Sequence, residues 1–593
     1  MPAARGARLV MARSAVADRT RLALFLAGRS LSAGSGRLLD LSSLPSRIAT
    51  PTSDRLLIAP QDLRTTDPTR AAEIYSGRYT FAGKTLDGLG RSPFSVPAPS
   101  PEWRDALHGF GWLRHLRAAD SALARSHARV LVDEWISLGG GPDAGAWTPE
   151  IVGRRVISWL CQSPLILDGA DRAFYRRFLR SLCRQVRYLK RRLPATRPGL
   201  PRLTVLAALS FAGLCLAGQT GLQRFASRRL GEEIEAQVLP DGGHVSRNPD
   251  ALVALLLDFL PLRQAYAAQN AAPPVPLLNG IDRMMPMIRF FRHADGNFAL
   301  FNGMGPTPID TIATVLAYDD ARGAPVLNAQ HSGYQRLEAG RTVVIADTGA
   351  PPPLPLSGEA HAGCLSFELS SRANRIVVNC GLPVFNREGW RSVARSTAAH
   401  STLVFEDTSS CRMVASARLK RVVGAPIVSG PTAVPVERAD RDEGVAVRAS
   451  HDGYVARFGI VHSRSLLLAI DGTRLHGQDR LSLAQGRQLR GSGEYVLRFH
   501  LHPSVRASKV QDGRGVLLVL PNREAWLFTA NELPIEIEES IFLAGADGPR
   551  RAEQMVVRGV FRERPETSWL FQRTEAPGGR RPRDEEEWAE LPL

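Results

Sequence analysis

The hydrophobic pattern of this 593-residue chain changes its period near residue 325. Before that point apolar residues recur every three or four positions, as do Trp103, Leu107 and Phe110, which is typical of helices that bury one face. After it, short alternating or β-branched runs such as GRTVVIADTG and EYVLRFHLHPSV are separated by turn-forming residues, which is typical of antiparallel strands. Runs of helices followed by runs of strands predict two domains of different class in contact.

The same patterns place the expected boundaries, since the chain is too long for one ordinary domain. We expect a basic N-terminal tail over 1–50, a helical domain over 51–325, an antiparallel β-sandwich over 326–575 and a polar tail over 576–593. The helices follow one another with short breaks, which suits hairpins stacked into a bundle, a solenoid or a toroid.

The charge of the chain suggests a class of partner. The formal net charge is +17, and arginine far exceeds lysine. A polyanion would suit this balance, although a coding bias toward arginine would produce it too. Interleaved aromatic residues and known nucleic-acid modules are missing, and we read no apolar run of 18 residues in the sequence. From charge alone the candidate partners are nucleic acid, an acidic polysaccharide and an anionic membrane surface. The missing features argue against nucleic acid and against integral membrane association.

One predicted helix carries much of this charge. In RRFLRSLCRQVRYLKRR five arginines step by four, four, three and four positions and so share one face: Arg176, Arg180, Arg184, Arg187 and Arg191. The stripe is either a solvated outer face or a surface that guides an anionic chain toward a groove.

The stretch LPDGGHVSRNPD, residues 239–250, interrupts the helical region with a dense set of polar groups. Asn248 before Pro249 is a natural cap for the next helix. The glycines allow a close approach of backbone to a ligand, next to His244 and Arg247. The stretch is therefore either a turn with a helix cap or one wall of a binding site.

The predicted strands contain a second group of polar residues, because seven of the 13 histidines lie between 361 and 502. Clusters of histidine with tyrosine, arginine or glutamate suit proton transfer or metal binding. The clusters are Glu359 with His361, Trp390 with Arg391, Arg395 and His400, His451 with Tyr454, His462 and Arg464, and Arg498 with His500 and His502.

Several of these motifs resemble the heparinase II/III family. The stretches AHAGCLSFELSSRANRIVVNCG, RSTAAHSTLVFED and HDGYVARFGIVHSRSLLLAIDG are similar to its C-terminal domain, and PEWRDALHGFGWLRHL, DGGHVSRNP and RFFRHADGNFALFNGMG to its helical part. The resemblance implies an incomplete α/α toroid followed by an antiparallel β-sandwich. It also implies a lyase that cleaves uronic-acid glycans by β-elimination, in the periplasm or cell envelope, although the N-terminus shows no typical secretory signal.

β-Elimination needs a base for the C5 proton, an acid for the leaving oxygen and a group that stabilises the charge on the carboxylate. The expected catalytic residues are His244, Asn248, His400 and Tyr454. The expected substrate-binding residues are Arg247, Arg391, Arg395 and Trp390.

The chain also departs from the family pattern. In some members two histidines and an aspartate hold zinc; His361 and His400 match the histidines, but Asn379 replaces the aspartate and Glu359 a further histidine. Asparagine is a weak zinc ligand, so we expect no required cofactor. The tyrosine that family lyases place early in the helix after the DGG turn is missing. Either Tyr454 or Tyr266 replaces it, or the chain is a non-catalytic glycan-binding or cell-envelope protein.

Overall fold

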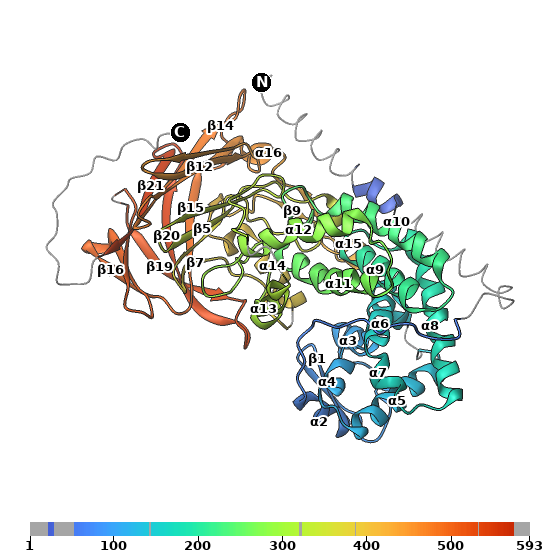
Figure 1. Cartoon of the computed structure of the whole chain (residues 1–593). Helices are drawn as coiled ribbons and strands as arrows, with labels where there is room; N and C mark the ends of the chain where they lie inside the picture. Colours follow the sequence, from blue (N-terminus) through green and yellow to red (C-terminus); the bar gives the residue numbers. More distant parts are fainter. Residues whose placement is uncertain are drawn as a thin grey trace.

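The computed structural model describes residue 20 and residues 22–28, 53–140, 144–318, 323–385, 387–531 and 533–574. The N-terminal tail expected over 1–50 lies outside these ranges except for residue 20 and 22–28, and the tail expected over 576–593 lies outside them entirely. Helices dominate before Ala317 and strands after Asn328 (Figure 1), as the change of period predicts. The exceptions are the hairpin of β1 (Arg78–Phe81) and β2 (Lys84–Asp87) and a few short helices in the second half.

The first half is a layered array of antiparallel helices. Its helices are α2 (Thr69–Tyr75), α3 (Pro101–Gly109), α4 (Leu113–Ala118), α5 (Ala122–Ser137), α6 (Pro149–Cys161), α7 (Ser163–Leu167), α8 (Arg172–Arg192), α9 (Leu200–Cys215), α10 (Thr220–Gln237), α11 (Pro249–Ala268), α12 (Val275–Phe290) and α13 (Ile309–Ala317), with the 3-10 turn η1 (Ala144–Trp147).

Helix α9 forms the centre of this domain because it is apolar almost all round. Every residue from Leu203 to Cys215 is buried, and α9 packs against α6, α10 and α11. The single helix that the spacing suggests around Leu107 and Leu113 is divided into α3 and α4. Phe110 ends α3 in a left-handed conformation (φ 56°), and its ring stays buried as the spacing predicts.

Among the described residues, α11 is the helix that is long and apolar enough to cross a membrane by length and composition. Its window has a mean hydropathy of 1.4, and 72% of that window is buried inside the fold. A buried apolar helix of this kind is equally typical of a protein core.

The second half consists mainly of two large antiparallel sheets. One has eight strands in the order β11-β12-β13-β14-β21-β18-β17-β16, and the other runs β19-β20-β15-β7-β6-β5-β4-β3, with β8 added beside β15. The first sheet is built from β11 (Val436–Arg441), β12 (Gly444–His451), β13 (Ile460–Ala469), β14 (Arg474–Leu483), β16 (Arg506–Val510), β17 (Gly515–Val519), β18 (Ala525–Thr529) and β21 (Glu566–Thr574). The second is built from β3 (Asn328–Ala329), β4 (Tyr334–Ala339), β5 (Thr342–Asp347), β6 (Phe367–Ser371), β7 (Asn374–Val378), β8 (Leu403–Phe405), β15 (Glu494–Leu501), β19 (Ile535–Phe542) and β20 (Arg550–Val560).

The two sheets pack face to face over an aromatic core. Phe367 of one sheet stacks on Trp569 of the other, with ring centroids 5.4 Å apart, and Phe499 meets the same indole edge-on at 5.0 Å. Alternate residues of each strand face this core, which is why the sequence alternates. Three short helices interrupt the strands: α14 (Arg387–Ala394), α15 (Ala417–Val423) and α16 (Val455–Phe458).

The helical domain is joined to the second sheet through buried polar contacts. His293 lies after α12 and reaches Glu368 (Nε2 to Oε2, 3.1 Å) and Ser370 (Nδ1 to Oγ, 2.8 Å) on β6. Arg336 on β4 donates to the carbonyls of Phe290 and Arg292 at 2.9 and 3.0 Å. These contacts fix the ends of the helices against the sandwich.

Candidate functional site

Residues 239–250, which we call the joint segment, connect α10 to α11 and form a tight turn. Leu239 N donates to Gly243 O at 2.8 Å, and Gly242 N donates to Leu239 O at 2.9 Å. The carboxylate of Asp241 accepts from Ser332 N at 2.7 Å and from Ser332 Oγ at 3.0 Å. Ser332 belongs to the sandwich, so this turn of the helical domain docks onto the second domain.

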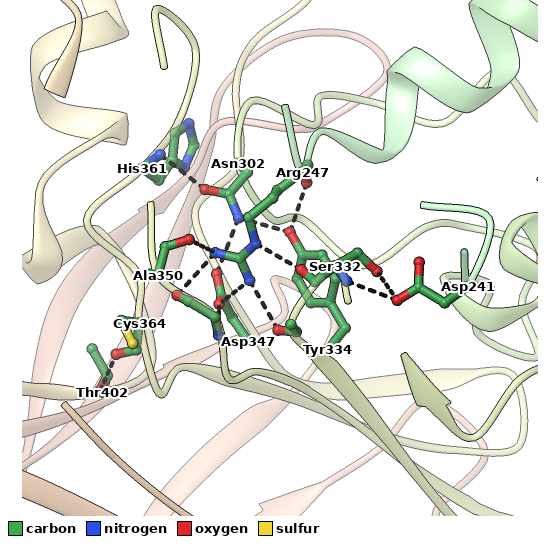
Figure 2. A network of polar contacts seen from close by, with 12 residues as sticks. Asp241, Arg247, Asn302, Ser332, Tyr334, Asp347, Ala350, His361, Cys364 and Thr402 are labelled. Atoms are coloured by element: carbon green, nitrogen blue, oxygen red, sulfur yellow. Dashed lines mark hydrogen bonds and ion pairs between the residues drawn. The ribbon is translucent and has the colours of Figure 1, made fainter. Parts of the chain in front are cut away.

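Arg247 completes the docking and is committed to protein groups. Its guanidinium donates to Asp347 Oδ1 at 2.6 Å and to four carbonyl oxygens, those of Ser332, Gly333, Gly349 and Ala350, at 2.8–3.1 Å (Figure 2). It also lies over the Tyr334 ring, 4.6 Å from the centroid. Asp347 raises the pKa of Arg247 further, against the effect of burial. We expected this arginine to hold a substrate carboxylate, but in the structure it clamps the two domains together.

The contacts of Arg247 continue into an interdomain polar network. Asn302 donates from Nδ2 to Asp347 Oδ2 at 3.0 Å and to Tyr334 Oη at 2.7 Å, and its Oδ1 accepts from His361 N at 3.1 Å. Figure 2 shows these residues converging from both domains. The sequence motifs around Arg247 and His361 therefore meet in space, although more than 100 residues separate them.

The network ends in a buried pair of histidines. His361 Nδ1 lies 3.0 Å from His400 Nε2, and His400 Nδ1 lies 2.7 Å from the carbonyl of Ser396. The carbonyl requires a proton on His400 Nδ1, so neutral His400 accepts at Nε2 from His361 Nδ1–H. Burial lowers the pKa of His400 to about 4. Gly363 makes room for this ring, because a Cβ there would lie 2.6 Å from His400 Cδ2.

The residues that match the family's zinc ligands do not fit a metal ion. His361 and His400 aim nitrogens at each other rather than at a shared point. Asn379 Oδ1 accepts from Ser401 N at 3.0 Å, and its Nδ2 donates to Glu368 Oε1 at 3.3 Å. Within the ranges that the structure describes, no three His, Cys, Asp or Glu side chains are grouped to bind a metal. We therefore derive no chemistry from zinc.

His244 and Asn248, expected in catalysis, have structural contacts of their own. His244 is buried; its Nδ1 accepts from Ser246 N at 3.1 Å and its Nε2 lies 2.9 Å from Gln237 Oε1. Burial lowers the pKa of His244 to about 4. Asn248 caps α11, accepting from Asp250 N at 3.0 Å. Asn248 is half-buried, with its Nδ2 beside Gly303, so it lies near the polar network while His244 faces the end of α10.

The two candidate tyrosines lie in the cores of their domains. Tyr454 is 1% exposed and donates from its hydroxyl to Leu403 O at 3.0 Å. Tyr266, fully buried near the end of α11, is hydrogen-bonded to Ser227 Oγ. Burial raises the pKa of both hydroxyls. At the start of α11, where family lyases place a tyrosine, the buried residues are Pro249, Ala251, Leu252 and Val253.

The residues around α14 that we expected to bind substrate together have separate contacts in the structure. Arg395 is fully buried and donates to the carbonyls of Ala360, Ala425 and Ser357, so it supports the loop that carries His361. Trp390 packs on a small apolar cluster. Arg391 is half-buried and pairs with Glu359.

A cavity of about 440 Å³ in the helical domain was missed by sequence reasoning. Phe385 of the sandwich forms part of its rim and lies against Gly83 in the β1–β2 turn. Five arginines and three carboxylates line it together with apolar side chains: Arg64, Arg70, Arg78, Arg114 and Arg154, Asp62, Glu73 and Asp105, and Ile74, Phe81, Trp112 and Ile157.

The arginines of this cavity differ in their partners. Arg64 and Arg154 share buried Asp258 at 2.7 and 2.6 Å. Arg114 donates to the carbonyls of Thr65 and Gly111, and no described carboxylate lies within ion-pair distance of it. Burial lowers the pKa of Arg114. A partly desolvated cation that has no ion-pair partner, and that Asp62 stabilises only through space, favours an anionic ligand.

The buried histidines predict a loss of stability in mild acid. His244 and His400 have folded pKa values of about 4, below the unfolded value of 6.5. The unfolded chain therefore binds more protons between pH 6.5 and 4, and stability falls as pH falls through this window. The full gap corresponds to about 3 kcal/mol per histidine. Denaturant midpoints at pH 7 and pH 5 measure it. A His244→Gln variant should show a shallower pH dependence, and an unchanged slope would contradict the assignment.

Comparisons with known proteins agree with this fold. A family profile described as "Heparinase II/III-like, C-terminal" matches residues 321–570. FtsZ-localized protein C of Caulobacter vibrioides (strain NA1000 / CB15N) is 34% identical over 540 residues, which cover 90% of this chain and 92% of that protein. The crystal structure of heparinase III has a TM-score of 0.66 at 15% identity over 84% of this chain and 80% of its own.

A second solved structure, the heparan sulfate lyase HepC mutant from Pedobacter heparinus, has a TM-score of 0.60 at 17% identity, covering 94% of this chain and 89% of its own. At this identity the two structures establish the fold, a helical toroid followed by a β-sandwich. The profile match, and the relative whose alignment covers nine tenths of this chain, identify the protein family. The chain belongs to the heparinase II/III family.

Proposed function

We propose that this protein binds acidic, uronate-containing glycan strands in the arginine-lined cavity, and that binding rather than β-elimination is its function. The observation that carries the proposal is the contrast between two sites. The cavity contains Arg114, which donates to two backbone carbonyls and forms no ion pair with a described carboxylate. In contrast, Arg247 is ion-paired to Asp347, and His244 and His400 are hydrogen-bonded to protein side chains.

The cavity has the chemistry that an acidic sugar requires. Arginine matches carboxylate through two parallel hydrogen bonds. Four of the lining arginines are ion-paired to protein carboxylates, which leaves Arg114 as the lining arginine without a described ion pair. Phe81, which is half-buried, offers apolar surface for the face of a sugar ring. The volume of about 440 Å³ lies within the ~300–1,000 Å³ typical of small-molecule sites.

The proposal against turnover depends on proton transfer. A general base works best with a pKa near the working pH, and burial lowers the pKa of His244 and of His400 to about 4. Both tyrosines have raised pKa values and donate or share their hydroxyl groups inside a core. Where lyases of the family place a tyrosine, the first turn of α11 reads Pro-Asp-Ala-Leu and contains no tyrosine.

The test combines binding and turnover on one substrate. We expect trigalacturonate to bind the purified chain without a rise in the absorbance of unsaturated uronate. Arg114→Gln should weaken binding about tenfold to hundredfold, because hydrogen bonds between charged groups contribute ~1.5–3 kcal/mol. Arg125→Gln, a change of equal charge on the outer face of α5, is the control.

Two outcomes would overturn this proposal. Equal affinity of the wild type and Arg114→Gln would show that the glycan is held elsewhere. A rise in absorbance that His400→Ala abolishes would establish β-elimination, the activity that the family resemblance implies. A far-UV spectrum of each variant confirms that it is folded. The periplasm or cell envelope, where such glycans occur, stays the proposed compartment for this function.

A second candidate function is favoured by the relative that covers nine tenths of this chain. FtsZ-localized protein C shares 34% identity over both domains, so the features that place it with FtsZ can be shared here. Imaging a fluorescent fusion together with FtsZ distinguishes the two candidates. Overlapping signals favour this second function, and fractionation with the periplasm favours the first.

A further inference from the structure

The arginine stripe expected from the sequence is an exposed face of α8, which we call the arginine track: Arg176, Arg180, Arg184, Arg187 and Arg191. Its members lie on the outer surface, four of them exposed and Arg187 half-buried, while the apolar residues of α8 face the core. None of the five forms an ion pair with a residue that the structure describes. Exposed arginines elsewhere do, such as Arg228 with Glu232 and Arg558 with Glu536.

A buried cation beneath the track adds to its positive charge. Arg155 on α6 is fully buried, and it donates to Gln185 Oε1 at 2.7 Å and to the carbonyls of His108 and Ala146. No carboxylate contacts it, and its Nη2 has no hydrogen-bond partner among the described residues. Arg155 and Arg184 lie 5.6 and 5.0 Å from the Trp147 ring. Uncompensated charge in a low-dielectric core strengthens the field at the surface above it.

The shape of the track narrows the class of partner. The charges follow one line along the helix, over about 22 Å at 1.5 Å per residue. A membrane-binding helix presents apolar side chains for insertion. Helix α8, every residue of which the structure describes, exposes no large apolar side chain. A single row of guanidinium groups fits a linear chain that carries a carboxylate at every repeat unit.

We propose that the arginine track is a second binding surface for an acidic polysaccharide chain, outside the cavity of the proposed function. This inference rests on that function for the identity of the glycan. Trp147, which Arg184 of the track contacts, belongs to η1, and η1 packs against α3. Two residues of α3, Asp105 and Gly109, line the cavity, so these contacts connect the track to the cavity region. One long chain that occupied both surfaces would bind more tightly than a short one through effective concentration.

The experiment compares long polygalacturonate with trigalacturonate on the full chain. Arg180→Gln/Arg184→Gln should weaken binding of the long polymer about tenfold, as expected from two exposed charge contacts, and leave trigalacturonate binding unchanged. Salt near 1 M should remove the difference, since the screening length is then about 3 Å. The control is Arg441→Gln/Arg551→Gln, which removes two exposed charges from the sandwich, one on edge strand β11 and one on β20.

The outcomes separate this inference from the function on which it rests. Equal weakening by the track and control variants would overturn the track as a site and leave the cavity standing. A second outcome is that the track variant loses binding of the long polymer while the wild type does not bind trigalacturonate at all. This outcome would support the track and refute the cavity. Preference of the track for polyglutamate, or for vesicles that contain phosphatidylglycerol, over polygalacturonate would overturn the glycan as its partner.

Discussion

Arg247→Met should destabilise the protein by about 3–5 kcal/mol, because it removes one partner of a buried ion pair. Asp347 is 2% exposed and would lose its ion-pair partner. Four carbonyl oxygens would lose the Arg247 donor, of which Gly333 O still accepts from Thr348 N at 2.9 Å. The clamp holds the joint segment on the sandwich. Its loss should therefore weaken the contact between the two domains, which His293 and Arg336 still connect, and lower the midpoint of the first transition in guanidinium chloride.

A double variant and a surface control test whether the loss of stability comes from the buried charge. Arg247→Met/Asp347→Asn removes both charges and should recover part of the loss, since the remaining amide can still be hydrogen-bonded. Arg558→Met breaks exposed pairs with Glu536 and Glu538 and should cost less than about 1 kcal/mol. Equal effects of Arg247→Met and Arg558→Met would show that the buried clamp contributes nothing special.

The fold could be predicted from the sequence because it depends on local periodicity. The step from a spacing of three or four to a spacing of two marks the passage from α13 to β4. The burial of α9 follows from its composition alone. The break between α3 and α4 could not be predicted in the same way, because the left-handed backbone at Phe110 leaves the apolar spacing intact.

The roles of the polar residues were harder to predict, because they depend on partners far away in the sequence. Arg247 has the composition of a ligand-binding residue, and only the position of Asp347, 100 residues later, makes it a clamp. Tyr454 sits near three polar residues in the sequence, but it is the N-cap of α16, and the turn that leads into this helix buries its ring in the core. Arg114 was overlooked because it sits in a short basic and apolar helix. The signal available was a cation between buried Leu113 and His115.

Gly242→Ala should be the most damaging small substitution in the joint segment. The residue has φ +88°, a conformation that costs an L-residue about 1–2 kcal/mol. A Cβ there would lie 1.8 Å from the backbone carbonyl oxygen of Arg283 and 2.4 Å from its carbon. Backbone of α12 cannot yield as a flexible side chain can, and overpacking adds about 1–3 kcal/mol. The expected loss of stability is therefore about 2–5 kcal/mol, measured as a lower denaturation midpoint.

The control is Gly221→Ala in the first turn of α10, where a Cβ would meet no atom within 4 Å and the backbone is helical. That variant should gain about 0.4–1 kcal/mol, because alanine restricts the unfolded chain. The two substitutions should change stability in opposite directions because the two glycines differ in position. Gly242 turns the chain so that Asp241 and Arg247 reach the sandwich, whereas Gly221 lies on an open helix surface. A neutral Gly242→Ala would mean that α12 and the joint segment can move apart, and the domain contact would then not depend on this turn.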